Sequence, residues 1–221
     1  MTAFRLCVDL NIWIKQYLAN TAGRRGTVSQ RIVQAVEDGR SGIGPIQLIV
    51  SHTMLTRLQG VLMRQGANAE TAMRFTHDIA SMALMGPAGE FPRMVFGGGV
   101  EPTREGMPQV YNPYATEAVA PPYDPEDGRV LDAALSGGAQ ALVTSNFRDF
   151  KHHNDDAVVR DRVHVRKSAH GDLWIVQPEE MMDWLATGRK PRPFPEIMMR
   201  RRKDGDASPS DTTGPGRITK P

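Results

Sequence analysis

The chain has 221 residues, of which 27 are Lys or Arg, 25 are Asp or Glu and one is Cys. This length is typical of one domain with extensions, and a single cysteine excludes both a disulfide framework and a cysteine-based zinc site. The near-balance of charge excludes a bulk polyelectrolyte. No apolar run approaches the roughly 18–20 residues that a membrane span needs, and the first residues lack the pattern of a signal peptide. We therefore expect a cytoplasmic protein with no membrane anchor.

The first part of the chain alternates short apolar runs with amphipathic segments. The run at 4–8 predicts a buried strand that closes at Asp9, and Ser51 and Asn68 stand where helix N-caps are expected. In chain order the pattern predicts a strand over 4–8, helices over 12–18 and 28–36, a strand over 46–50, and helices over 51–65 and 68–84. This alternation predicts an α/β fold with a mostly parallel sheet.

A Pro- and Gly-rich stretch at 86–123 interrupts this order and predicts a long insertion beside the functional site, with one short strand at 94–96. Beyond it we expect a helix over 124–135, a strand over 139–144, a hairpin of 163–165 with 173–176, and a helix over 178–185 that has Pro in its first turn. The predicted organisation is a domain over 1–186, a C-terminal extension over 187–202 and a disordered tail over 203–221.

Three acidic residues fall near the carboxyl ends of predicted strands, where ligands bind in open parallel sheets. Asp9 closes the first strand, Asp127 lies in the first turn of the helix before the 139–144 strand, and Asp149 follows that strand. If these two strands are neighbours, the three carboxylates converge. Such a group repels itself unless a cation neutralises it, and oxygen ligands suit Mg²⁺ or Mn²⁺.

Each of these acids also has a simpler explanation. Asp127 stands at the third helical position with Asp124 as the cap, a favourable place for a negative charge near a helix N-terminus. Asp149 follows Asn146 in a segment that suits a turn. Asp9 is the hardest to explain structurally, because an acid that closes a buried strand needs a partner.

Two stretches resemble the PIN-domain ribonucleases. Residues 8–13, VDLNIW, resemble the opening strand motif of that family. Residues 124–150 resemble its third and fourth motifs at the same spacing and read DPEDGRVLDAALSGGAQALVTSNFRDF. The ending ALVTSNFRDF is similar to the branch formed by toxin components of toxin–antitoxin pairs. The resemblance covers roughly residues 4 to 185 without much of 86–123.

This resemblance implies a three-layer α/β/α domain whose acidic pocket holds one or two Mg²⁺ or Mn²⁺ ions and hydrolyses RNA. It assigns the metal-ligand and catalytic roles to three acids and supporting roles to three polar residues that orient them. The acids are Asp9, Asp127 and Asp149, and the supporting residues are Asn11, Thr144 and Asn146. The likeness to toxins further implies an antitoxin partner and a homodimer.

One position departs from the family pattern. The family usually has a glutamate in the helix after the second strand, and here SHTMLTRL places Arg57 at that position. A fixed cation removes one metal ligand, and if it faces the pocket it becomes a candidate contact for RNA phosphate. The alternative function is therefore a catalytically weakened PIN-like module that binds RNA or a protein partner without cleaving.

Overall fold

The computed structural model describes residues 2–86, 94–95, 125–168 and 171–193. The chain divides into two units, residues 1–191 and 192–221, and the fold below is that of the first. Its elements are β1 (Phe4–Val8), α1 (Leu10–Thr21), α2 (Val28–Glu37), β2 (Arg40–Ser41), β3 (Gly44–Ser51), α3 (His52–Arg64), α4 (Ala69–Met85), β4 (Met94–Val95), α5 (Pro125–Ser136), β5 (Ala141–Val143), β6 (Asp156–Val159), β7 (Val163–Ser168), β8 (Gly171–Val176) and α6 (Pro178–Thr187).

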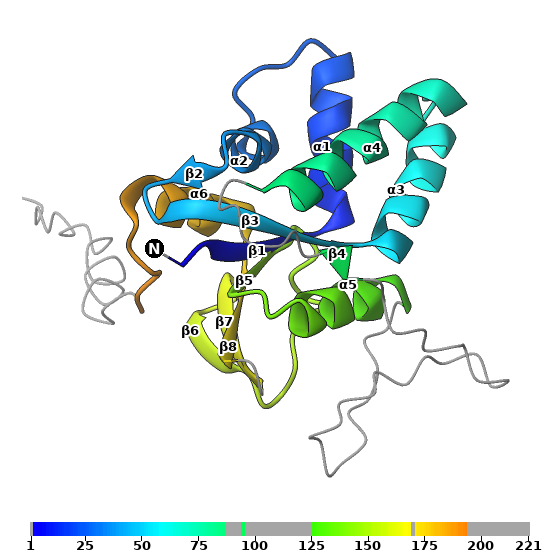
Figure 1. The fold of residues 1–221 in the computed structure, drawn as a ribbon. Coiled ribbons are helices and arrows are strands. Elements are labelled where there is room, and N and C mark those ends of the chain that lie inside the picture. The colour runs from blue at the N-terminus through cyan, green and yellow to red at the C-terminus, as the bar shows by residue number, and fades with distance from the viewer. Residues whose placement is uncertain (1, 87–93, 96–124, 169–170, 194–221) are drawn as a thin grey trace, which may run out of the picture. The chain divides into compact units, whose positions relative to one another are not determined.

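A single mixed sheet organises the domain, with strand order β2-β3-β1-β5-β8-β7-β6 and β4 paired with β3 (Figure 1). The strands β3, β1, β5 and β8 run parallel to one another, and Leu6 of β1 faces Leu48 on one side and Ala141 on the other. The strands β7 and β6 continue the sheet in antiparallel fashion. The central position of β1 places the residue after it between two parallel neighbours.

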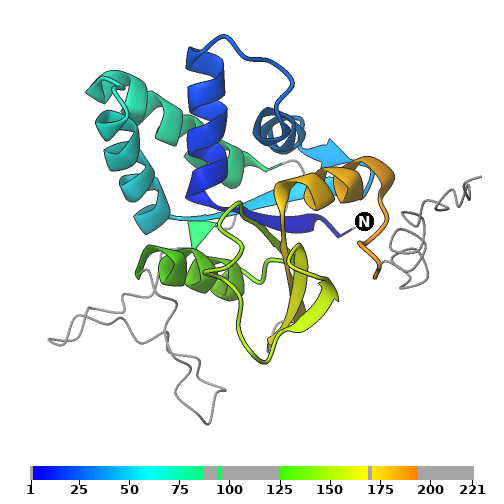
Figure 2. The same cartoon turned by 180° about the vertical axis from the view of Figure 1, so that it is seen from behind.

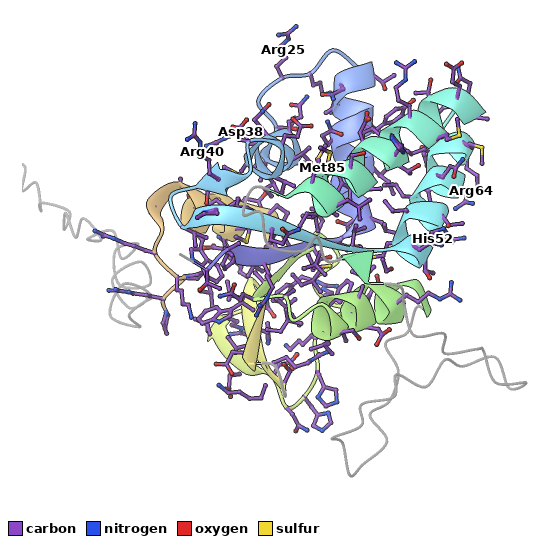
Figure 3. The ribbon with its side chains drawn as sticks, viewed as in Figure 1. Arg25, Asp38, Arg40, His52, Arg64 and Met85 are labelled. Carbon is purple, nitrogen blue, oxygen red and sulfur yellow. The ribbon has the colours of Figure 1, made fainter. Side chains whose placement is uncertain are left out.

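Helices cover both faces of this sheet. Seen from either side, α5 lies on one face, and α1 and α2 lie on the other with α6 beside α2 (Figures 1 and 2). The central strands are buried: Leu6, Leu48 and Leu142 are at most 2% exposed. Charged side chains such as Arg25, Arg40 and Arg64 are exposed and point away from the core (Figure 3). The predicted α/β/α architecture with a mostly parallel central sheet is confirmed.

Local capping explains where several helices begin. Thr27 and Gln30 form a capping box at the start of α2. The hydroxyl of Ser51 accepts a hydrogen bond from the Met54 N–H at 3.2 Å, and the Asn68 side chain accepts one from the Thr71 N–H at 2.7 Å. These bonds satisfy amide groups that have no partner within the helix. The structure thus uses Ser51 and Asn68 as the sequence predicts.

The predicted hairpin is present as β7 and β8, and the predicted strand near 94 is present as β4. Two strands were not predicted. The first, β2, has only two residues, and β6 begins with exposed Asp156 and Ala157, so neither carries an apolar alternation. The rest of the predicted insertion over 86–123, the predicted cap Asp124 and the tail over 203–221 lie almost wholly outside the described residues, and the domain bounds remain predictions.

Among the helices that the structure describes, none combines the length and the apolar character that crossing a bilayer requires.

Candidate active site

The candidate site lies where β1 and β5 end side by side. Val8 pairs with Val143 in parallel register, and the Asp9 N–H donates to the Val143 carbonyl at 3.0 Å. Asp9 is the N-cap residue of α1, and Thr144 directly follows β5. The neighbouring strands therefore deliver two polar side chains to one point at the carboxyl edge of the sheet.

The Asp9 carboxylate is held by two short hydrogen bonds. Its Oδ2 accepts from the Thr144 Oγ1 hydroxyl and from the Asn11 Nδ2 amide, both at 2.6 Å. Asn11 Nδ2 also lies 3.3 Å from Thr144 Oγ1, and Asn11 Oδ1 accepts from the Ser145 N–H at 3.1 Å. Asp9 and Thr144 are 3% and 0% exposed. The direction of the carboxylate is therefore fixed by side chains from two separate parts of the chain.

Asn146 joins this group to Asp127. Its backbone N–H donates to Thr144 Oγ1 at 2.9 Å, and its side-chain Nδ2 donates to Asp127 Oδ2 at 3.2 Å. Asp127, in the first turn of α5, is 7% exposed. The structure thus brings Asp9 and Asp127 onto one hydrogen-bond network through Thr144 and Asn146.

Burial dominates the electrostatics of Asp9. It raises the pKa of the Asp9 carboxyl from 3.8 to about 6, and the hydrogen bonds from Thr144 and Asn11 oppose this rise. Burial, and after it the nearby Asp9 charge, also raises the pKa of the Cys7 thiol. Among the described residues no Lys, Arg or His forms an ion pair with Asp9. The site is therefore electrically suited to receive a cation.

The donor chemistry fits a hard divalent ion. Two buried carboxylates, held by neutral amide and hydroxyl donors, offer oxygen atoms of the kind that Mg²⁺ and Mn²⁺ prefer. Within the part of the chain that the structure describes, no group of three or more His, Cys, Asp or Glu side chains is spaced to hold a metal ion. Two of the three predicted ligands are thus linked, and the three-carboxylate centre stays a prediction.

Two predicted residues, Asp149 and Arg57, remain to be placed. Asp149 follows Asn146 by three residues, and Arg57 lies on the separate helix α3. Asp149 is half-buried, and its backbone N–H donates to the Asn146 carbonyl at 3.3 Å. Its carboxylate forms no hydrogen bond or ion pair with another described residue. Arg57 is exposed on α3, whose buried side consists of Met54, Leu55, Leu58 and Leu62. Neither residue is drawn into the Asp9 network by a described contact.

Sequence reasoning missed one participant, Ser145. Ser145 takes part through its backbone N–H, which donates to Asn11 Oδ1, and not through its own side chain. A main-chain donor is available at almost every residue type, so no sequence signal identifies it.

Comparison with known proteins agrees with the geometry. A family model described as the PIN domain matches residues 5–148, which include Asp9, Arg57, Asp127 and Asn146 and end one residue before Asp149. A comparison with curated proteins finds no match. PIN domains are typically metal-dependent nucleases. Because the match covers well over half of the sequence and includes the buried acids at the sheet edge, the chain belongs to the PIN domain family.

Proposed function

We propose that this chain is a metal-dependent ribonuclease and the toxin component of a toxin–antitoxin pair that acts in the cytoplasm. Asp9, Asp127 and Asp149 would hold one or two Mg²⁺ or Mn²⁺ ions. The observation that carries the proposal is the buried Asp9 carboxylate, joined to Asp127 through Thr144 and Asn146. Membership of the PIN family supports nuclease chemistry. The RNA substrate, the metal and the toxin role are the further steps that we propose.

The protein side chains have the task of holding oxygen ligands in place. Thr144 and Asn11 direct one oxygen of Asp9, and Asn146 directs one oxygen of Asp127. Side chains that orient a ligand in this way support metal affinity and geometry. When bound, a divalent ion would supply an activated water and neutralise the charge that develops on a phosphodiester during in-line displacement.

Three further contacts belong to the proposal, one with RNA and two with protein partners. The guanidinium of Arg57, exposed on α3, is proposed to contact RNA phosphate, since its planar fork matches phosphate oxygens. An antitoxin protein and a second copy of the chain are proposed as partners on the likeness to the toxin branch.

The test is a Mn²⁺ titration followed by melting temperature and RNA cleavage. At about 100 times the dissociation constant, a ligand specific for the native state stabilises it by about 2.7 kcal/mol, which raises the melting temperature of a chain this size by roughly 5–10 °C. We expect this rise, and Mn²⁺-dependent cleavage, in the wild type and not in Asp9→Asn. Asp172→Asn, an exposed acid of β8, is the matched control and is expected to behave as the wild type. Cleavage that survives EDTA would sink the proposal.

A second candidate function is favoured by Arg57, which stands where the family usually has a glutamate. In this alternative the chain is a PIN-like module that binds RNA or a protein without cleaving it. Asp9→Asn would then leave binding intact, and Mn²⁺ would not raise the melting temperature of the wild type. The same titration therefore separates the two functions.

A further inference from the structure

The segment between β5 and β6, residues 144–155, carries both Asn146 and Asp149. Its beginning is fixed by the sheet, because the Thr144 N–H donates to the Val176 carbonyl of β8 at 3.1 Å. Asp149 has no side-chain bond to a described residue, so the position of its carboxylate depends on how the backbone around it is held. The contacts of the backbone and side chains on both sides of Asp149 therefore determine where this acid lies.

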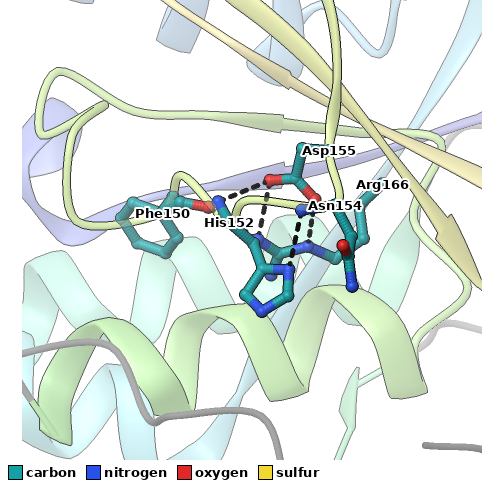
Figure 4. Close-up of polar contacts among 5 residues, drawn as sticks. All are labelled: Phe150, His152, Asn154, Asp155 and Arg166. Atoms are coloured by element: carbon teal, nitrogen blue, oxygen red, sulfur yellow. Dashed lines mark hydrogen bonds and ion pairs between the residues drawn. The ribbon is translucent and has the colours of Figure 1, made fainter.

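Arg166 of β7 binds the part of the segment that follows Asp149, at Phe150 and Asp155 (Figure 4). Its Nε and Nη2 donate to the two carboxylate oxygens of Asp155, each at 2.8 Å, and Nη2 also donates to the Phe150 carbonyl at 2.8 Å. Asp155 Oδ2 in turn accepts from the His152 N–H at 2.9 Å. One guanidinium thus binds the residue directly after Asp149 and the far end of the segment together.

A second contact comes from the same face of β7. His164 lies two residues before Arg166, so both side chains point to one side of the strand. The His164 ring packs against Phe147, with the ring centroids 4.9 Å apart. Phe147 and Phe150 are 5% and 1% exposed. The backbone that carries Asp149 therefore runs between two residues with buried rings. The Phe147 ring packs on His164, and the Phe150 backbone carbonyl accepts a hydrogen bond from Arg166.

Forming the Arg166–Asp155 ion pair requires that both charged groups lose hydration, which is unfavourable. The two side chains are 17% and 2% exposed, so both charges have lost most of their hydration. Such a pair is no more stabilising than a well-packed apolar pair, but its fork geometry fixes one arrangement. Its fork also reaches the Phe150 carbonyl, so the arrangement that it fixes includes the backbone directly after Asp149.

We propose that Arg166 is a positioning residue that, through the Phe150 carbonyl and Asp155, holds Asn146 and Asp149 in place at the carboxyl edge of the sheet. Its catalytic meaning rests on the proposed nuclease function. Arg166 does not touch the substrate or a metal in this proposal and acts only through the segment 144–155.

The first arm of the test measures amide hydrogen exchange without metal. Arg166→Lys keeps the charge but loses the fork, and Arg166→Met removes both. We expect the amides of residues 146–151 to exchange about ten- to a hundredfold faster in Arg166→Lys, as when a charge-assisted bond to a locally opening segment is lost. Amides of β1 should keep their protection. Lys167→Met is the matched control, because Lys167 pairs with exposed Asp172 on the same strand.

The second arm measures the Mn²⁺ dissociation constant of the same variants by electron paramagnetic resonance of free Mn²⁺. Loss of a residue that orients a metal ligand typically weakens metal binding by about 10- to 100-fold, and we expect Arg166→Lys to fall in this range and Lys167→Met to match the wild type. RNA cleavage by Arg166→Lys should need about 10- to 100-fold more Mn²⁺ to reach half of its maximal rate. A smaller folded fraction would lower the apparent kcat without shifting this Mn²⁺ midpoint.

The outcomes separate the two proposals. Unchanged exchange at residues 146–149 overturns the positioning role, even if residues 150–155 loosen. Faster exchange with unchanged Mn²⁺ affinity overturns it as well, because the segment would then move without consequence for the site. If the wild type binds no Mn²⁺, the proposed function fails, and the exchange arm alone decides whether Arg166 holds Asn146 and Asp149. If Arg166→Met does not fold, Arg166→Lys carries both arms.

Discussion

Asp9 keeps a carboxylate in a place that water barely reaches. It is 3% exposed, and two neutral donors at 2.6 Å replace part of its hydration. Its pKa of about 6 in the folded chain shows that these donors only partly offset the loss of solvent. Keeping Asp9 ionised at neutral pH therefore destabilises the metal-free fold. A cation bound beside the carboxylate would remove this cost by neutralising its charge.

The pH dependence of stability follows from this shift. Because folding raises the pKa from 3.8 to about 6, the folded chain binds more protons between these values. The contribution of Asp9 is fully present below pH 3.8 and is lost as the pH rises through 6, by about 3 kcal/mol in total. We expect urea unfolding in EDTA to reveal this loss in the wild type relative to Asp9→Asn. Parallel curves for the two proteins between pH 4 and 7 would contradict it.

For single residues, the sequence predicts the site best where a polar residue directly follows a buried strand, as Asp9 follows β1 and Thr144 follows β5. The sequence predicts that Asp9 and the residues after the 139–144 strand share one edge if the two strands are neighbours, and β1 and β5 are neighbours. The supporting places of Thr144 and Asn146 are implied only by the resemblance to the PIN family. The Arg166–Asp155 pair could not be predicted in the same way. Its partners lie eleven residues apart across a hairpin, and nothing in their types distinguishes a buried ion pair from two solvated charges.

Among the elements, α3 contains a glycine that its helix does not need. A Cβ on Gly60 would find only the flexible Arg64 Nη1, at 3.6 Å. Glycine inside a helix costs roughly 0.5–1 kcal/mol relative to alanine, so we expect Gly60→Ala to stabilise the protein by about that amount. Urea denaturation at constant m-value measures the change. A destabilised Gly60→Ala would mean that α3 needs the close approach or flexibility that glycine provides.

Gly42 is the contrasting control for this change. Its N–H donates to the Leu185 carbonyl of α6 at 2.7 Å, and a Cβ there would lie 2.6 Å from the Ala186 carbonyl oxygen. Overpacking of this kind typically costs 1–3 kcal/mol, so Gly42→Ala is expected to destabilise by about that much. Opposite signs for the two substitutions would confirm that α6 sits directly against the β2–β3 turn.

The elements that the sequence predicted are those with a strong local signal. The helices α3 and α4 begin at side-chain caps, and β1 and β3 are apolar throughout most of their length. The strand β6 has no such signal, because its place in the sheet comes from pairing with β7 and its pattern is interrupted by an irregularity between Ala157 and Val159. Tertiary context decides such a strand.

For the whole molecule, the extent of the hydrophobic core indicates which part of the chain a truncated protein needs in order to fold. Its buried apolar residues extend from Phe4 to Leu185. Phe4 and Trp184 pack edge to face with ring centroids 5.2 Å apart, so α6 completes the core beside β1. The chain ending at residue 193 contains all of these groups.

We therefore expect a protein of residues 1–193 to melt within about 2 °C of the full chain, since a change below about 0.5 kcal/mol moves the midpoint no further at this size. A protein of residues 1–177 lacks α6 and exposes the apolar faces of its neighbours, so we expect it to lose cooperative unfolding. Calorimetry of the two truncated proteins checks both expectations. A large drop for 1–193 would show that residues beyond it stabilise the fold.

The two ends of the sheet are unlike its interior. One end consists of β2 and β4, which are each two residues long and both pair with β3, and β2 bears exposed Arg40. The other end is β6, which starts at exposed Asp156 and contains an irregularity. Short, charged or interrupted borders resist the addition of a foreign strand, which protects against edge-to-edge aggregation. Within the described part of the chain, two copies that associate would therefore meet through helices or loops rather than by extending one continuous ribbon of backbone bonds.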